Sequence, residues 1–410
     1  MINQRDRQII RDLAKRIADI ADMPKMEKKR EMWKRHNRLE RVKPMILVFP
    51  EGSWDEIDTF IPRQCTEAPA CWIEFDLLRQ LWAYDNIRDD KPVEKIWTVE
   101  KKLHESSWGI EGKQVSATTS RGAYRIEPVI KEASDLKKLR FPEYTYDEAA
   151  TMSEFEMMQD LIGDIMDVQI KGVRHVSFHL MGIYTVWRGV GQVMEDMYDE
   201  PEMLHDAMAF LAEAAQRRVK QYIDQNLLSL NNDKSYQNSG GVGYSTELPK
   251  PGFNPDRVRP CDMWASAEAQ EMAQVSPKMH REFVLEYEKK LLEGWGLLGY
   301  GCCEDLTNKL DDICSIPNMR RISIAPSANV DKCAEKLQEK FIFSWKPQPS
   351  HLVGRFDEKM IENYIRHALE VSKNCVIELI LKDTHTCENH PERFTIWTDI
   401  AQRLATEYAS

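Results

Sequence analysis

The segment LLGYGCCEDLTNKLDDI, residues 297–313, gathers side chains that could do chemistry. Two thiols, Cys302 and Cys303, follow a short apolar run, and two carboxyl groups, Glu304 and Asp305, come directly after them. Thiolates and carboxylates are metal ligands, and a carboxyl group can also act as a general acid. Packing and helix capping are the alternatives, because free cysteine is often buried and a carboxylate favours the first turn of a helix.

The elements around this segment must hold it in place. In the second half of the chain, short apolar runs alternate four times with amphipathic segments of ten or more residues. This order is typical of βα units around a parallel sheet. No glycine-rich phosphate loop follows any predicted strand, which argues against a dinucleotide-binding arrangement. The predicted strands lie at residues 45–49, 174–180, 296–302, 320–326, 341–347 and 375–383, with a further candidate at 227–232.

We therefore predict an α/β fold, a single (β/α)8 TIM barrel over residues 41–410. Residues 1–40 carry apolar side chains at helical spacing and predict N-terminal helices packed on the barrel. Residues 108–131 alternate and contain turn residues, so they predict an antiparallel β-hairpin insertion. In such barrels, chemistry gathers at the carboxyl ends of the strands. The polar residues predicted there are Glu51, His179, Asn231, Asn232, Asp262, Cys302, Cys303, Glu304, Lys346, Asp383 and His385.

Composition narrows the class of protein. The 410 residues are 42% hydrophobic and 30% charged, as in a globular chain, and the net charge is -11. An acidic chain without a long basic block is a poor binder of nucleic acid. We see no signal peptide and no apolar run that approaches the ~20 residues of a membrane span. Nine irregularly spaced cysteines favour reduced thiols and a cytoplasmic protein.

Three further segments form a recognisable set. Residues 179–211 contain a glycine, an aromatic residue and Arg-Gly followed by an acidic helix, residues 263–294 contain a Ser-Pro helix, and residues 299–313 contain a cysteine just before a predicted helix. Together they resemble the uroporphyrinogen decarboxylase superfamily, whose third segment reads His-x-Cys-Gly-Asn and which includes zinc-dependent, corrinoid-linked methyltransferases. With the first strand and the last strand–helix unit, the resemblance covers most of residues 25–407, and it implies a TIM barrel.

The decarboxylase itself does not fit. Its first strand is followed by an arginine-rich loop that holds the carboxylates of the porphyrinogen. Here the same place reads PEGSWDEI, residues 50–57, in which Glu51, Asp55 and Glu56 would repel such a substrate.

The methyltransferase branch binds zinc through His-x-Cys and a second, distant cysteine. Cys303 matches the family cysteine, but Gly301 stands where the histidine should be. Near the last strand, further donors are offered by Asp383, His385, Cys387 and His390. Cys303, Glu304 and His385 are all accepted zinc-ligand types, and a catalytic site needs only three protein ligands. The resemblance thus implies a zinc site, and the chemistry of these three residues makes them its candidate ligands.

The resemblance further implies the methyltransferase I component of an anaerobic aryl-ether O-demethylase, which moves a methyl group from a methoxylated aromatic to Co(I) on a separate corrinoid protein. The leaving phenolate needs a Lewis acid or a general acid, and His385, Asp383 or Glu304 could supply the proton. Cobalamin would come with the partner, because DTHTCE, residues 383–388, lacks the glycine of a base-off cobalamin motif.

The substrate ring requires an aromatic pocket at the strand ends. Trp264 and Tyr300 are the strongest candidates, and His179 and Glu51 are candidate substrate contacts. Three alternatives stay open: a methylcobamide-to-thiol methyltransferase, a metal-free decarboxylase-like lyase that would need a basic pocket, and a non-catalytic barrel that binds a corrinoid protein.

Overall fold

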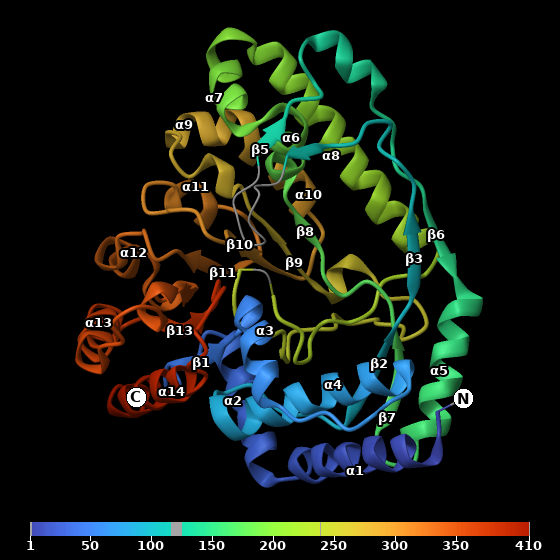
Figure 1. The fold of residues 1–410 in the computed structure, drawn as a ribbon. Coiled ribbons are helices and arrows are strands. Elements are labelled where there is room, and N and C mark those ends of the chain that lie inside the picture. The colour runs from blue at the N-terminus through green and yellow to red at the C-terminus, as the bar shows by residue number, and fades with distance from the viewer. Residues whose placement is uncertain (1, 116–124, 238, 410) are drawn as a thin grey trace.

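A computed structural model describes residues 2–115, 125–237 and 239–409 of the chain. Its centre is a sheet of seven parallel strands with helices around the outside (Figure 1). In spatial order the strands are β1 (Met45–Val48), β13 (Val376–Leu381), β12 (Ile342–Trp345), β11 (Met319–Ile324), β10 (Leu297–Tyr300), β9 (Trp264–Ala267) and β8 (Ser177–Phe178).

This sheet confirms a barrel-like α/β fold, but the described residues show no closed ring of eight strands. The edge strands β1 and β8 are not hydrogen-bonded to each other. The candidate strand at 227–232 forms only one parallel bridge, between Leu228 and Val173. At the free edge of β1, Asp90 takes the place of a strand: its amide donates to the Ile46 carbonyl and its carboxylate accepts from the Ile46 amide.

The helices cover the outer face of the sheet and its two ends. They are α1 (Gln4–Ala21), α2 (Pro24–Asn37), α3 (Trp54–Ile57), α4 (Ala68–Trp82), α5 (Glu148–Ile162), α6 (Leu180–Arg188), α7 (Val190–Asp199), α8 (Pro201–Asp224), α9 (Pro277–His280), α10 (Glu286–Leu292), α11 (Leu310–Cys314), α12 (Val330–Leu337), α13 (Glu358–Val371) and α14 (Glu392–Glu407). Among them, α11 is short and begins after a turn at residues 307–309. No helix in the described part of the chain is long and apolar enough to cross a membrane.

Short strands outside the main sheet form three pairs. The strand β2 (Ile96–Glu100) pairs in parallel with β7 (Asp167–Lys171), and β3 (Lys102–Glu105) pairs antiparallel with β6 (Tyr144–Asp147). The predicted hairpin is confirmed where it is described: β4 (Lys113–Val115) pairs antiparallel with β5 (Arg125–Glu127). Its tip, residues 116–124, lies outside the described residues.

The sheet buries both of its faces, as parallel sheets do. In β13 all six residues are buried, and their side chains alternate between two environments. Leu379 and Leu381 pack outward in the main core beneath the helices. Glu378 and Ile380 point inward, where Ile380 joins a small apolar cluster with Met45.

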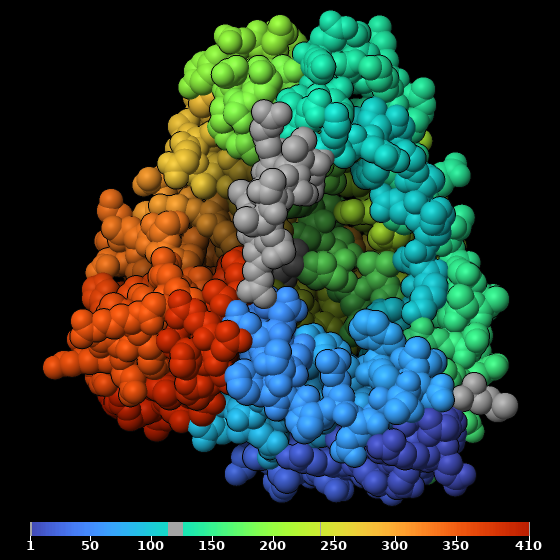
Figure 2. All heavy atoms as spheres, viewed as in Figure 1, coloured from blue at the N-terminus to red at the C-terminus, as the bar shows by residue number. Residues whose placement is uncertain are grey.

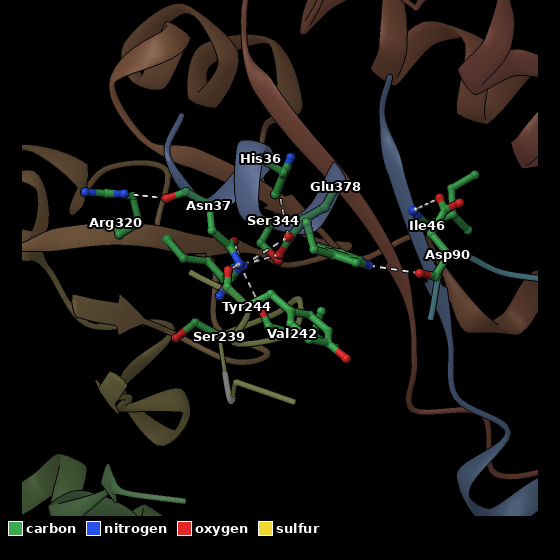
Figure 3. Close-up of polar contacts among 12 residues, drawn as sticks. His36, Asn37, Ile46, Asp90, Ser239, Val242, Tyr244, Arg320, Ser344 and Glu378 are labelled. Atoms are coloured by element: carbon green, nitrogen blue, oxygen red, sulfur yellow. Dashed lines mark hydrogen bonds and ion pairs between the residues drawn. The ribbon is translucent and has the colours of Figure 1, made fainter. Parts of the chain in front are cut away.

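Inside the barrel, buried polar side chains connect helix α2, strand β13 and the loop around Val242 (Figure 3). Glu378 accepts a hydrogen bond from His36 Nε2 over 3.0 Å. It also forms an ion pair with Arg321, whose Nε lies 3.0 Å from Glu378 Oε1. Burial would raise the pKa of Glu378, but Arg321 and His36 lower it to about 2. Asn37, at the end of α2, donates to the carbonyls of Val242 and Tyr244 over 2.8 and 2.6 Å.

Those two carbonyls belong to the loop SGGVGY, residues 239–244, which enters the barrel. A Cβ at Gly240 would come within 1.7 Å of Ser344 Oγ, so only glycine fits there. Lys346, predicted at the mouth, instead points inward and donates to Ser344 Oγ over 2.8 Å and to the Ser239 carbonyl. The loop therefore plugs the barrel axis between the helix α2 and the strand ends.

Candidate active site at the carboxyl ends of the strands

Polar side chains from five strand ends converge at one end of the sheet. The set contains four predicted residues and two that the sequence analysis missed, and each directly follows its strand or is separated from it by one or two residues. They are Glu51 after β1, His179 after β8, Glu268 after β9, Cys303 after β10, and Lys382 and Asp383 after β13.

The two thiols lie at the centre of this set. Cys302 Sγ and Cys303 Sγ are 3.5 Å apart. Lys382 Nζ lies 3.4 Å from Cys302 Sγ, and Cys303 Sγ lies 3.4 Å from Asp383 Oδ2. Cys303 is exposed at the mouth and Cys302 is half-buried. A cation and a carboxylate thus flank a thiol pair.

These neighbours shift the pKa values of the two thiols in opposite directions. The hydrogen bond from Cys302 lowers the pKa of Cys303, and the charge of Lys382 contributes to the lowering. The same contact with Cys303, together with burial, raises the pKa of Cys302. The exposed thiol is therefore the one that ionises first, and the thiolate is the nucleophilic form.

The carboxylates at the ends of β1 and β13 face each other. The backbone N–H of Asp383 donates to Glu51 Oε2 over 2.8 Å. Burial and the charge of Asp383 raise the pKa of Glu51. Asp383 Oδ1 also lies 3.6 Å from Lys382 Nζ. The Lys382 ammonium group therefore lies between Cys302 and the carboxylate of Asp383.

On the opposite side, His179 and two glutamates form an acid–base group. His179 Nε2 lies 2.8 Å from Glu271 Oε2, and its ring packs against Gly182, where any Cβ would come within 2.3 Å. Burial opposes the charge of His179, but Glu271 and Glu268 outweigh it and raise its pKa. Burial and the neighbouring Cys302 raise the pKa of Glu268 to about 8. Glu268 is therefore a protonated carboxyl group at neutral pH.

Glu304 does not lie where a metal ligand was predicted. Its side chain is only 1% exposed. Its Oε1 accepts from the Ala269 amide over 3.0 Å and its Oε2 accepts from the Cys302 amide over 2.7 Å. Both oxygens are thus occupied by backbone donors. This carboxylate fixes the turn that carries the thiols, a capping-like role, instead of facing Cys303.

The other predicted ligands do not complete a metal site either. His385 is exposed at the mouth, near enough to Glu51 for its charge to lower the pKa of that carboxyl group against the effect of burial. The described residues contain no group of three histidine, cysteine or acidic side chains arranged to hold a metal ion. The set of Cys303, Glu304 and His385 is therefore not assembled, chiefly because Glu304 is turned into the protein.

The two aromatic residues predicted to contact the substrate, Trp264 and Tyr300, lie away from the mouth. Tyr300 points outward, behind the strand, where its hydroxyl donates to Glu288 Oε2 over 2.7 Å and contacts His280 Nε2 at 3.0 Å. Trp264 begins β9 and so lies at the amino end, where its indole donates to the Gly243 carbonyl. Both side chains are buried, and neither reaches the mouth.

Glu268 and Lys382 are the residues that the sequence analysis missed at this site. Glu268 directly follows the run WASA, and Lys382 is the first charged residue after VIELIL. Both residues could therefore have been predicted from the rule that functional residues lie at the carboxyl ends of the strands. The strand WASA is short and has small residues, so its end is not evident without the structure.

A cavity of about 1140 Å³ opens beside the mouth, in the seam between β1 and the segment around β7. We call it the seam cavity; Figure 2 shows the hollow between the blue helices and the teal strands. Phe49, Trp54 and Tyr236 are among its lining residues. The charge of Lys382 also acts on Tyr236, which places this ring between the cavity and the mouth.

The sequence pattern predicts no basic pocket, yet the seam cavity is basic. Seven lysines and arginines line it, against three acidic residues. Glu56, one of the acids expected to repel anions, is turned away and accepts from the amides of Cys387 and Asn389. Glu51 faces Asp383 instead of the cavity.

Comparison with known proteins adds little to this geometry. No protein-family profile matches the chain, and no curated protein matches it. Among solved structures, a methyltransferase from Methanosarcina mazei is similar, with a TM-score of 0.48 and 11% sequence identity. The alignment covers 90% of this chain and 97% of that chain. Function is therefore argued from the site itself.

Proposed function

We propose that the mouth of this barrel transfers a methyl group from a methylated small molecule to Co(I) of a separate corrinoid protein. An aryl methyl ether is the donor that we favour. The arrangement that carries the proposal is the carboxyl group of Glu268 beside His179 and Cys302, with Lys382 and Asp383 flanking the thiol pair. The resemblance of the segment around Cys303 to corrinoid-linked methyltransferases supports the same reading.

The chemistry requires a proton donor at one position. As the bond between the methyl carbon and the ether oxygen breaks, both of its electrons stay on the oxygen, and the methyl carbon bonds to the Co(I) that brings its own electron pair. The phenolate that leaves is a poor leaving group unless its charge is neutralised. A positioned general acid contributes typically 10²- to 10⁴-fold to such a step.

Glu268 is the group in the mouth best suited to donate that proton. Its pKa of about 8 keeps the proton on the carboxyl group at neutral pH, while leaving it acidic enough to protonate a phenolate. His179, held by Glu271, lies near enough for its charge to act on Glu268. After the reaction, the proton lost by Glu268 can be restored from solvent at the open mouth.

Next to Glu268, Lys382 and the thiols supply a polar wall of mixed charge. Lys382 Nζ lies close to both Cys302 Sγ and Asp383 Oδ1, so its charge is shared rather than free. This cation can stabilise negative charge that develops on the donor oxygen. Cys303 and His385, both exposed, form the part of the rim that an incoming partner protein would meet.

Zinc remains a proposal separate from this scheme. The predicted ligands do not fit the ion as they are arranged, because both oxygens of Glu304 are bonded to backbone amides. No step above passes through a metal ion. The metal content of the protein is therefore tested on its own, as described in the Discussion.

Reconstitution tests the proposed function. The purified chain is mixed with a corrinoid protein reduced to Co(I), and loss of the Co(I) absorbance is followed with a methoxybenzene, a methylamine or a methyl thioether as donor. We expect turnover with the methoxybenzene and a loss of roughly 100-fold or more in the Glu268→Gln variant. The exposed Glu293→Gln serves as the matched control. Absence of turnover with every donor and several corrinoid proteins, from a folded protein, would contradict the proposal.

A further inference from the structure

The seam cavity carries an excess of positive charge that the proposed reaction does not use. The whole chain has a net charge of -11, so a basic cavity is a local departure from its average. A concave site lined by one sign of charge focuses the field and attracts counter-ions. Its cations are Lys25, Lys29, Arg88, Lys91, Lys101, Arg174 and Lys234, and its acids are Asp76, Asp89 and Glu100.

The three acids offset this charge only in part. Glu100 is paired with Arg174. Asp89 accepts from the backbone amides of Val48 and Lys91 with its two oxygens. Asp76 accepts from Gln80 Nε2 over 2.7 Å. Each carboxylate thus already has a partner other than the free lysines.

Four of the seven cations are held by other groups. Arg88 pairs with Asp399, and Arg174 pairs with Glu100. Lys29 Nζ donates to the Asp89 carbonyl over 2.5 Å, and Lys101 Nζ donates to the Asn226 carbonyl over 2.6 Å. These four define the walls of the cavity.

The remaining three, Lys25, Lys91 and Lys234, form no ion pair with any carboxylate of the described residues. Lys25 Nζ lies 4.5 Å from the centroid of the Tyr84 ring, and Lys91 Nζ lies 5.6 Å from that of Phe49. Burial lowers the pKa of Lys91, the charge of Asp89 opposes this, and the charge of Lys234 adds to the lowering. The ammonium groups of Lys91 and Lys234 therefore repel each other, and Asp89 offsets this repulsion only in part.

Aromatic side chains complete the lining. Tyr84 and Phe49 lie beside the free lysines, and Trp54 and Tyr236 continue the wall toward the mouth. The Tyr236 hydroxyl is buried and has no hydrogen-bond partner among the described residues. Binding sites for small molecules combine apolar, aromatic walls with a few convergent polar groups in volumes of about 300–1,000 Å³. The seam cavity has this composition and enough room.

We propose that the seam cavity binds a small organic anion, with its carboxylate or phosphate between Lys25, Lys91 and Lys234 and its flat apolar body against Phe49 and Tyr236. The inference does not rest on the methyl-transfer proposal, since it concerns binding alone. The anion relieves the repulsion between the lysines, and the rings cover the apolar part.

Calorimetric titration of the full chain tests the site without any corrinoid partner. The probes are benzoate, phenyl phosphate, inorganic phosphate and benzamide, the neutral counterpart of benzoate. We expect benzoate or phenyl phosphate to bind at least about 10-fold more tightly than benzamide, because hydrogen bonds between charged partners are stronger than those to a neutral amide. The better of the two anions identifies the head group.

Variants separate the site from general electrostatics. Lys91→Gln and Lys234→Gln should each weaken anion binding by about 10-fold and leave benzamide binding unchanged. Lys91→Arg should retain affinity, and the exposed Lys373→Gln should have no effect. Equal affinities for benzoate and benzamide, no binding of either anion, or the same loss in Lys373→Gln would overturn the proposal. Phenyl phosphate binding no tighter than inorganic phosphate would overturn the role assigned to the rings.

Discussion

The backbone N–H of Asp383 donates to Glu51 Oε2 over 2.8 Å, and both residues have a positive φ, of 58° and 46°. They follow the paired strands β13 and β1. Left-handed backbone costs a residue with a side chain of the order of 1 kcal/mol or more, and such residues cluster at functional sites. The bond between them holds two strained strand ends together and keeps both carboxylates at the mouth.

The raised pKa of Glu268 predicts a pH dependence. Below about 8 the carboxyl group is neutral and can donate a proton, and above this value it is ionised. Demethylation should therefore fall as the pH rises through about 8, and this limb should vanish in Glu268→Gln. The unfolded state releases this proton from about 4.5 upward, so the carboxyl group also makes the fold less stable as the pH rises from about 4.5 to 8.

Single-turnover rates at a series of pH values give the first readout, and urea denaturation at the same pH values gives the second. The Glu293→Gln control should follow the wild type in both. A rate limb that persists in Glu268→Gln would assign the titration to another group.

The thiol pair should react unequally. Cys303 is exposed and its pKa is lowered, whereas the pKa of Cys302 is raised. Iodoacetamide at neutral pH should therefore modify Cys303 first. In Lys382→Gln the alkylation of Cys303 should slow by roughly 3- to 10-fold, which corresponds to half to one pKa unit. Peptide mass spectrometry over time measures both rates, with Lys373→Gln as control. Faster modification of Cys302 would show that the assigned order of ionisation is wrong.

Metal analysis of untagged protein tests the zinc prediction. About one zinc per chain that is lost in Cys303→Ala and His385→Ala would support those two ligands. Glu304→Gln should not change the zinc content, because the Glu304 oxygens are bonded to backbone amides, but it should destabilise the turn around Cys302. If Glu304→Gln also removes zinc, the carboxylate must turn outward in the protein that binds the ion.

The plug in the barrel axis should not tolerate a side chain. A Cβ at Gly240, whose φ is 135°, would lie 1.7 Å from Ser344 Oγ, so Gly240→Ala should destabilise the fold by about 2–4 kcal/mol. Gly191 in α7 is the matched control, because its Cβ would meet nothing within 4 Å. Gly191→Ala should be neutral or stabilise the helix by up to about 1 kcal/mol. Urea denaturation measures both; equal stabilities would mean that the loop can leave the barrel.

Tyr300 should prove structural. Its hydroxyl donates to the buried Glu288, one of whose oxygens has no other partner in the described residues. Tyr300→Phe should therefore cost about 1–3 kcal/mol of stability and leave the KM for the methyl donor unchanged. Tyr198→Phe, at a side chain that is 75% exposed, is the control. An increased KM with unchanged stability would instead show that Tyr300 contacts the substrate.

The strand-end rule accounts for what could be predicted. Apolar runs locate the strands, and parallel strands bring their carboxyl ends together, so Cys303, Asp383, His179 and Glu51 reach one mouth. The side of the sheet on which the Tyr300 side chain lies could not be predicted. All four residues of β10 are buried, so the sequence shows no alternation of apolar and polar residues that would distinguish the two faces.

Other features depend on contacts that no local pattern contains. Glu304 is captured by the amide of Ala269, from the loop after another strand. The free lysines of the seam cavity come from three distant parts of the chain, at Lys25, Lys91 and Lys234. A net charge of -11 hides such a local excess of positive charge.

The bond between His36 and Glu378 also has a consequence for synthesis, because the two residues are 342 positions apart in the chain. Helix α2 leaves the ribosome early, but the buried carboxylate that it contacts is made almost last. Until β13 emerges, the His36 ring lacks the carboxylate that it contacts in the barrel interior. The first helices can pack with α4 and α5 before then, but the contacts inside the barrel are completed only with the final strand, so we expect the barrel to be completed late in synthesis.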